Sequence, residues 1–315
     1  MSLAFLLITN LAVLSAPGSA APTITVSEYT VLLSGTTGNQ LQYRYSGVDY
    51  KPYADMLWTP AGVNVLRDSP EDHKHHHALM YAINVNEVNF WEEFTAPGRQ
   101  QHLGLREMLV ESDRAQLNES VNWIDPANGD ALFLEEQRRI EVLQTSLPCT
   151  LVHWQATFTV PRERGTALLG GSHYHGLGMR FVESMDKTAK FLYSVDQEGE
   201  VVRGSEKLTP GGWCAVQGMA DDKPITVAMF DHPSNARAAL WFTMTDPFAY
   251  LSATMNLYRE PIEVKHPASF VIQYGVAAFD GAVDAAQIQR AYESWLEVAG
   301  AGAPAIATAE KGNQP

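Results

Sequence analysis

The feature that most constrains this chain is a series of short segments in which apolar and polar residues alternate. The alternation is clear in Thr23–Val26, Leu41–Tyr45 and Ala156–Val160. A period of two places successive side chains on opposite faces of an extended strand, so each segment can bury one face. Segments rich in β-branched and aromatic residues predict further strands at 131–134, 225–230, 239–243 and 270–276.

Turn-forming residues separate the predicted strands, and one helix is predicted near the end of the chain. Gly, Pro, Asn, Asp and Ser are concentrated at 34–39, 125–130 and 209–212. Asp284–Leu296 carries apolar residues three and four positions apart, as one face of a helix requires. Many short strands with a single C-terminal helix predict an all-β fold, a sandwich or barrel that forms one domain over residues 22–299.

The two ends of the chain differ from this pattern. Leu3–Leu14 is mostly apolar, and small residues follow it up to Ala21. This predicts a signal peptide at 1–21 and export to the periplasm or the extracellular space, although no Lys or Arg precedes the apolar run. A buried N-terminal strand or a different start site is the alternative. The Ala/Gly/Pro-rich segment 300–315 is predicted to be disordered.

Charge and cysteine content narrow the partners. The formal net charge is -14, with a pI of about 5.1. Such a chain is repelled by phosphate backbones and anionic lipids, so we expect neither nucleic acid nor membrane as a partner. Cys149 and Cys214 could pair after export or remain buried thiols, and the sequence leaves both possibilities open.

The densest group of titratable residues is a histidine cluster at a predicted loop-to-strand junction. Of ten histidines, His73, His75, His76 and His77 fall within five positions. In an extended segment, His73, His75 and His77 would share one face. Two imidazoles on one face suit a divalent metal ion such as zinc, and we assign His73 and His75 as metal ligands and His76 to proton transfer. The alternative is a solvated polar loop.

A second segment, 170–181, places two histidines between glycines. Tyr174 and His175 are candidates for proton transfer, and Arg180 could hold substrate oxygens or a carboxylate. Glycines on both sides allow close approach of the backbone, but they are equally typical of a β-bulge packed in a sheet.

A third segment, 231–237, follows a predicted strand. Here His232 is a candidate catalytic residue, and Asn235 and Arg237 are candidate substrate-binding residues. An ordinary turn capped by His232 is the alternative. Trp91 could stack on a sugar, and at most one of its neighbours Glu92 and Glu93 should face the same cleft, because adjacent residues in a strand point to opposite faces.

Taken in order, these segments resemble the methane oxygenase PmoA-like family. The matching residues are Asp72, His73, His75, His76, Phe90, Trp91, Tyr174, Gly176, Leu177, Gly178, Arg180, Asp231, His232, Pro233, Asn235, Arg237 and Trp241. The resemblance implies a large antiparallel β-sandwich similar to galactose mutarotases and to the sandwich domains of polysaccharide lyases. It also implies a carbohydrate substrate.

Three functions follow from these expectations. A lyase that cleaves a glycan or an oxidised glycoside by β-elimination needs a base, an acid and a cationic group, and the histidines, Tyr174 and the arginines, with a zinc, manganese or calcium ion, would supply them. A sugar mutarotase or epimerase needs only an acid and a base. A glycan-binding module needs aromatic platforms and no clustered titratable groups. We expect the first.

Overall fold

The computed structural model describes residues 21–299 and 306–307, and its strands form three antiparallel sheets. The first sheet has ten strands in the spatial order β1 (Thr23–Val26), β2 (Thr30–Gly35), β3 (Gly38–Arg44), β4 (Tyr53–Leu57), β5 (Leu79–Ala82), β14 (Gly176–Arg180), β21 (Tyr250–Thr254), β20 (Leu240–Met244), β17 (Glu206–Pro210) and β16 (Glu200–Arg203).

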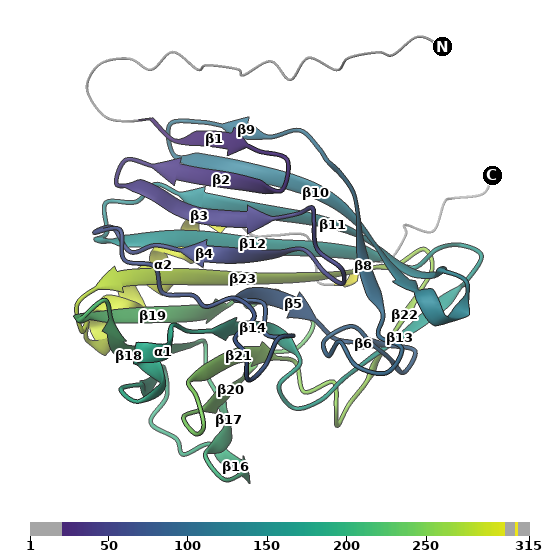
Figure 1. Ribbon diagram of the computed structural model, residues 1–315. Helices are drawn as coiled ribbons and strands as arrows, with labels where there is room; N and C mark the ends of the chain where they lie inside the picture. Colours follow the sequence, from purple (N-terminus) through teal and green to yellow (C-terminus); the bar gives the residue numbers. More distant parts are fainter. Residues whose placement is uncertain (1–20, 300–305, 308–315) are drawn as a thin grey trace, which may run out of the picture.

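The second sheet also has ten strands and stacks against the first (Figure 1). Its order is β15 (Lys190–Tyr193), β18 (Trp213–Ala220), β19 (Lys223–Asp231), β23 (Ser269–Asp280), β12 (Cys149–Thr159), β11 (Ala131–Leu143), β10 (Arg114–Asp125) and β8 (Arg99–Leu105), with β9 (Leu109–Val110) beside β10 and β24 (Ile306–Ala307) beside β23.

Short elements complete the fold. A small sheet joins β22 (Ile262–Lys265), β13 (Thr166–Gly170), β6 (Asn84–Val85) and β7 (Val88–Asn89). Two short helical turns are α1 (Glu183–Asp186) and the 3-10 turn Pro126–Asn128, and α2 (Ala285–Ala299) is the long helix of the described residues. The all-β sandwich with a C-terminal helix is thereby confirmed.

Side-chain alternation gives the second sheet two buried faces. In β12, Val152 and Trp154 point into the core shared with the first sheet, whereas Leu151 joins a second core beneath α2. Each large apolar side chain buried in this way contributes roughly 1.5–3 kcal/mol. The predicted strand at 270–276 follows the same rule within β23, and its near-continuous apolar sequence reflects the burial of both faces.

Helix α2 covers the outer face of the second sheet. Ile288, Ala291 and Trp295 form its buried stripe, and the Asp284 side chain accepts a hydrogen bond from the Gln287 backbone N–H (2.8 Å) at the start of the helix. This cap and stripe explain why the predicted helix at 284–296 forms. It extends three residues further than expected, to Ala299.

The two cysteines do not pair. Both are free and buried, Cys149 in the core beneath α2 and Cys214 in the core between the sheets. They therefore lie on opposite faces of the second sheet. Burial without a nearby cation raises the pKa of the Cys149 thiol to about 12, so this residue stays protonated and unreactive.

Several expectations fall at the ends of the chain. The predicted signal peptide at 1–21 and the predicted disordered tail at 300–315 lie outside the described residues, apart from Ala21 and the two residues of β24. Within the described part of the chain, no helix is long and apolar enough to cross a membrane.

Replacing Gly275 with Ala should destabilise the fold. A Cβ atom at this position would lie 2.7 Å from the Trp295 ring and 2.8 Å from the Phe230 ring. We expect a loss of about 1–3 kcal/mol, as is typical of overpacking, measured by urea denaturation. Gly170→Ala is the matched control, because its Cβ would meet only Asn84, at 4.0 Å. Equal stability of the two variants would contradict this packing.

Candidate functional site

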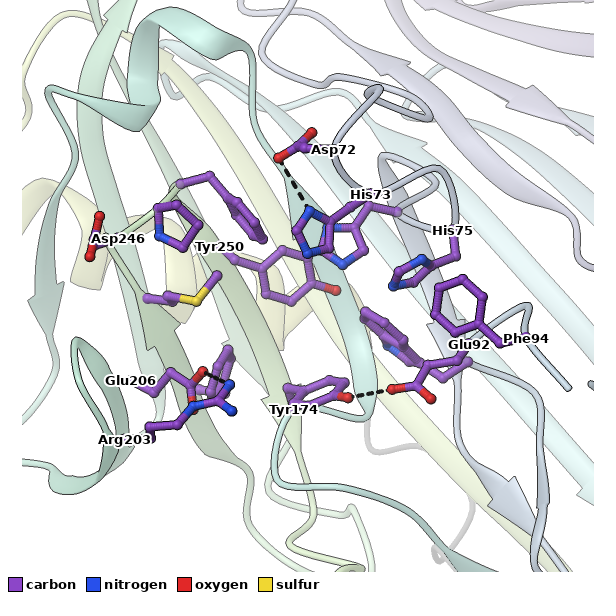
Figure 2. A pocket seen from close by; sticks show the side chains of 16 residues that line it. Asp72, His73, His75, Glu92, Phe94, Tyr174, Arg203, Glu206, Asp246 and Tyr250 are labelled. Carbon is purple, nitrogen blue, oxygen red and sulfur yellow. Dashed lines mark hydrogen bonds and ion pairs between the residues drawn. The ribbon is translucent and has the colours of Figure 1, made fainter.

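A cavity of about 520 Å³ opens beside the first sheet, where β16, β17, β20 and β21 meet the loops that carry residues 72–76, 91–94, 174 and 246–248 (Figure 2). Its volume is typical of small-molecule sites. Six aromatic side chains line it, together with three histidines, four carboxylates and one guanidinium. These are Trp91, Phe94, Tyr174, Phe242, Phe248, Tyr250, His73, His75, His76, Asp72, Glu92, Glu206, Asp246 and Arg203.

The histidine cluster is a turn and not a strand. The His73 N–H donates to the Pro70 carbonyl and the His76 N–H donates to the His73 carbonyl, both at 2.9 Å. These bonds bring the rings of His73, His75 and His76 within 4.6–5.7 Å of one another, centre to centre. The expected grouping of His73, His75 and His77 on one face is therefore wrong, because the turn sends His77 the other way.

Burial keeps two of these imidazoles neutral. Desolvation, followed by the neighbouring histidines, lowers the pKa of His75 to about 4 and that of His76 to about 2. Near pH 7, each of the two rings therefore has one unprotonated nitrogen that can accept a proton. His76 is held between Trp91 (5.1 Å) and Tyr250 (5.2 Å), and its Nδ1 has no hydrogen-bond partner among the described residues.

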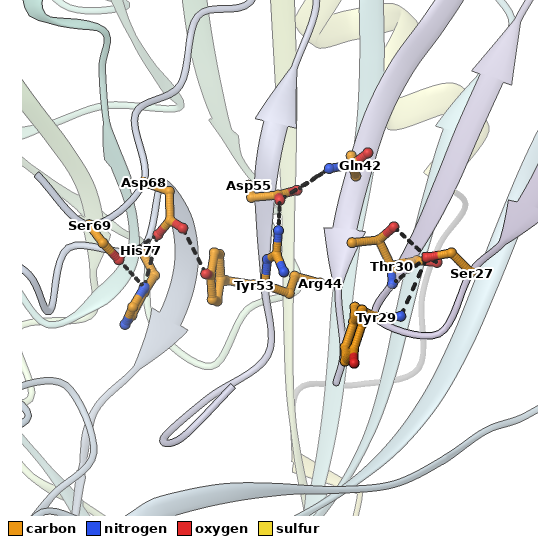
Figure 3. Close-up of polar contacts among 10 residues, drawn as sticks. All are labelled: Ser27, Tyr29, Thr30, Gln42, Arg44, Tyr53, Asp55, Asp68, Ser69 and His77. Carbon is orange, nitrogen blue, oxygen red and sulfur yellow. Dashed lines mark hydrogen bonds and ion pairs between the residues drawn. The ribbon is translucent and has the colours of Figure 1, made fainter. Parts of the chain in front are cut away.

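His77 is absent from the cavity lining and belongs to a charged network; Figure 3 shows its contacts with Asp68 and Ser69. Its Nδ1 lies 3.0 Å from Asp68 and its Nε2 lies 2.8 Å from Glu93. Burial opposes the charged form of His77, but the hydrogen bonds to these two carboxylates raise its pKa. His77 in turn lowers the pKa of both carboxylates. The Tyr53 hydroxyl donates to Asp68 at 2.8 Å and completes this end of the network.

The same network fixes the segment that carries Trp91. The buried Lys51 ammonium donates to the Trp91 carbonyl at 3.1 Å and pairs with Glu93. Glu93 thus points into the network, whereas Glu92 lines the cavity. Only one of the two adjacent acids thus reaches the cavity, although residues 91–93 lie outside any strand and the strand alternation behind that expectation does not apply.

Glu92 forms an acid–base pair with a tyrosine from another part of the chain. The Tyr174 hydroxyl donates to the Glu92 carboxylate at 2.6 Å (Figure 2). Burial, followed by this hydrogen bond, raises the pKa of Tyr174, so the phenol keeps its proton. The Trp91 ring contacts Tyr174 edge-on at 4.8 Å and separates the pair from His75 and His76.

His175 lies behind the wall of the cavity. It is buried and stacked against Trp91, with ring centres 5.4 Å apart and planes 7° from parallel. Neither of its ring nitrogens has a hydrogen-bond partner among the described residues. Its contacts support the Trp91 ring, and His175 is absent from the cavity lining.

Glycines of the second sequence segment allow two strands to pack closely. A Cβ atom on Gly178 would lie 2.0 Å from the Tyr250 hydroxyl, and one on Gly176 would lie 1.9 Å from the Ala253 carbonyl oxygen. Only glycine leaves room for Tyr250 to reach the cavity across β14. The sequence alternative of packing within a sheet therefore explains these glycines.

Arg180 is a support beneath the cavity. Its guanidinium is buried, lies 3.6 Å from the centre of the Phe248 ring, and pairs with Asp72 (3.3 Å) and Asp186 (3.4 Å). These contacts hold two lining residues in place. Arg180 itself is absent from the lining, so the predicted direct contact with substrate has no support in this arrangement.

The third sequence segment lies elsewhere in the molecule. His232 packs edge-on against Trp295 of α2 (5.5 Å), and the Asn235 side-chain amide donates to Asp231 (2.8 Å) and to the Gln273 carbonyl (2.9 Å). Arg237 donates to backbone carbonyls of the loop after β21. None of the three lines the cavity, and their contacts are those of a turn tied to the sheet and the helix.

Metal binding receives no geometric support. Among the described residues, no group of three or more His, Cys, Asp or Glu side chains is arranged to hold a metal ion. His73 and His75 both line the cavity, with ring centres 5.7 Å apart and planes tilted by 57°. The divalent ion stays a prediction of the sequence.

Sequence reasoning missed half of the cavity. Tyr250 and Phe248 come from β21 and the turn before it, and Arg203 and Glu206 come from the hairpin of β16 and β17. Nothing in their local sequence distinguishes them. The available signal was Gly178, because a glycine inside a predicted strand indicates that another group approaches closely.

The fold and cavity define an all-β sandwich with a histidine-lined and aromatic-lined site. The chain belongs to the Family of unknown function (DUF6807), whose pattern matches residues 30–293. The resemblance to the methane oxygenase PmoA-like family is therefore wrong: short motifs in a common order were not specific enough to distinguish the two families. No curated protein matches the chain.

Two of the solved structures that resemble this one are α-galactosidases. The enzyme from Lactobacillus brevis is 7% identical with a TM-score of 0.49, and the match covers 86% of this chain and 40% of that one. The GH36 enzyme from Geobacillus stearothermophilus is 12% identical with a TM-score of 0.47, covering 83% of this chain and 41% of that one. This chain spans about two fifths of their length, and no activity follows from similarities at this level.

Replacing His175 with Phe should reduce the loss of stability on acidification. Burial lowers the folded-state pKa of His175 to about 3, from 6.5. Between these values the unfolded chain binds a proton here that the folded chain does not, so this contribution is complete above pH 6.5 and falls as the pH drops.

Urea denaturation from about pH 8 to about pH 5 measures the effect. We expect the variant to lose up to about 1.4 kcal/mol less per pH unit than the wild type. Phe keeps a flat ring against Trp91, so the stacking provides its own control. An equally steep slope in both proteins would contradict the assignment of His175 as a buried neutral imidazole.

Proposed function

We propose that this protein is a carbohydrate-active enzyme that moves protons at a sugar ring bound in the 520 Å³ cavity. One observation carries the proposal. Neutral imidazoles of His75 and His76 line the same aromatic cavity as the hydrogen-bonded pair of Tyr174 and Glu92, with the Trp91 ring between them. A base and a protonated acid in one cavity are the minimum for such chemistry.

The lining suits a sugar. The 59% exposed ring of Phe94 offers a flat apolar face, and the Tyr174 hydroxyl with nearby carboxylates offers hydrogen-bonding groups. Trp91, which is 2% exposed and stacked on His175, backs the cavity and is not the stacking platform that the sequence suggested. The Tyr250 hydroxyl is buried without a hydrogen-bond partner among the described residues. It lies against Gly178, so Tyr250 forms part of the cavity wall.

The charge of the lining favours a neutral sugar. The described lining residues bring the carboxylates of Asp72, Glu92, Glu206 and Asp246 but only the guanidinium of Arg203, which already pairs with Glu206 at 2.6 Å. A uronate would meet this acidic lining unfavourably. An oxidised but uncharged glycoside avoids the repulsion, and its carbonyl group would acidify the neighbouring C–H bond.

β-Elimination on such a glycoside is the reaction we favour. His75 accepts the carbon-bound proton, because its pKa of about 4 makes it a better base than His76 at about 2. The C–O bond to the leaving group then breaks, a carbon–carbon double bond forms, and Tyr174 donates its proton to the departing oxygen. Glu92 holds the phenol in position and stabilises its proton.

Mutarotation or epimerisation is the second candidate. It needs an acid and a base but no cationic group for an enolate, and Arg180 and Arg237 both lie outside the cavity lining. An unsaturated product detected by ultraviolet absorbance distinguishes elimination from mutarotation, which changes optical rotation without forming a double bond.

Tyr174→Phe should abolish most of the turnover while leaving binding nearly intact. Loss of a general acid costs roughly 10²–10⁴ in kcat, with KM little changed. Tyr193→Phe is the matched control, because that hydroxyl contacts Thr243 and does not line the cavity. If the wild type binds sugars without any turnover, the site is a binding module, and the catalytic proposal fails.

Metal content of the purified protein tests the remaining sequence prediction. If His73 and His75 hold a divalent ion, the wild type contains it stoichiometrically and a folded double alanine variant loses it. We expect turnover to survive treatment with a chelator, because the acid and base proposed above are side chains of this chain. Activity that disappears on chelation and returns with zinc, manganese or calcium would contradict this mechanism.

A further inference from the structure

A second, smaller cavity adjoins the first. Its volume is about 340 Å³, and it shares Arg203 and Glu206 with the first cavity. These two side chains form an ion pair at 2.6 Å, and Glu206 also lies 3.2 Å from His173 Nε2. The two cavities therefore adjoin at this ion pair.

The second cavity has the components of a sugar-binding surface. Tyr258 presents its ring with 61% exposure at one side, and the bidentate Arg259–Glu200 ion pair (2.5 and 3.0 Å) supplies planar polar groups. Its charged lining is balanced, with Arg203 and Arg259 against Glu200 and Glu206. An exposed ring beside hydrogen-bonding groups, without excess charge, fits a neutral pyranose.

The loop that carries Tyr258 is held in place by the third sequence segment. Arg237 donates from Nη1 to the Met255 carbonyl (2.8 Å) and to the Glu260 carbonyl (2.9 Å). One guanidinium thus bridges the two ends of the loop, and Arg259 ties its middle to β16. Arg237 does not line the first cavity, but it positions the loop that carries Tyr258.

We propose that the second cavity is a subsite for the next sugar unit, so that the substrate is a neutral disaccharide or longer oligosaccharide rather than a monosaccharide. Tyr258 is its stacking platform, and Arg237 positions that platform. This inference rests on the proposed function, because it assumes that the first cavity holds a sugar.

Calorimetric binding of unoxidised sugars tests the subsite. These sugars have no carbonyl group in the ring and cannot undergo the elimination, so binding is measured without turnover. The probes are glucose and galactose, the disaccharides cellobiose, maltose and lactose, and the matching trisaccharides. We expect at least one disaccharide to bind the wild type about tenfold more tightly than its monosaccharide. Tyr258→Ala should remove that gain and leave monosaccharide affinity unchanged.

Tyr29→Ala is the matched control. Tyr29 is 46% exposed and lies between β1 and β2, at the edge of the first sheet opposite β16. It should retain the full gain. Arg237→Ala should reduce the gain without affecting monosaccharides, and an equal loss for both ligands would refute its positioning role.

The remaining outcomes separate the two proposals. If monosaccharides and disaccharides bind the wild type equally, or if Tyr258→Ala weakens both alike, the subsite is refuted and the proposed function stands. If no sugar in the panel binds, the subsite is refuted, and the proposed function is then decided separately by turnover of an oxidised glycoside by the wild type and by Tyr174→Phe.

Discussion

The site depends on buried charge that is fully compensated. Lys51 is 1% exposed, yet it carries an ammonium group that contacts Glu93 and the Trp91 carbonyl, and Glu93 is shared with His77. Removing one partner of a buried pair leaves an unpaired charge, at a cost of about 3–5 kcal/mol. The arrangement is therefore rigid, and it fixes the position of the Trp91 backbone relative to the histidine turn.

The surroundings of the histidine turn set the protonation states of its imidazoles. The cluster contains two kinds of imidazole, because His77 lies between two carboxylates and His75 and His76 lie among aromatic rings. Carboxylates favour the charged form of His77, and desolvation favours the neutral form of the other two. Adjacent residues of one turn thus take opposite roles, one holding the scaffold and the others available to a ligand.

Strand and helix patterns were readable from the sequence because they are local. The alternation at 156–160 reappears in β12, and the apolar stripe at 284–296 reappears in α2, since burial of one face imposes a fixed period on each element. The histidine segment does not follow a strand pattern. Turn hydrogen bonds of His73 and His76 replaced the extended geometry that the alternation rule assumed.

The sequence by itself determined the all-β architecture, the C-terminal helix and the gathering of His73, His75 and His76 into one site, because neighbours in the chain cannot move far apart. Only the tertiary structure decided which distant residues join them. It brought Tyr174, Tyr250 and Glu206 to the cavity and sent His232 to the helix. Strand order in a sheet is set by packing over the whole domain, and the local composition of these segments carries no record of it.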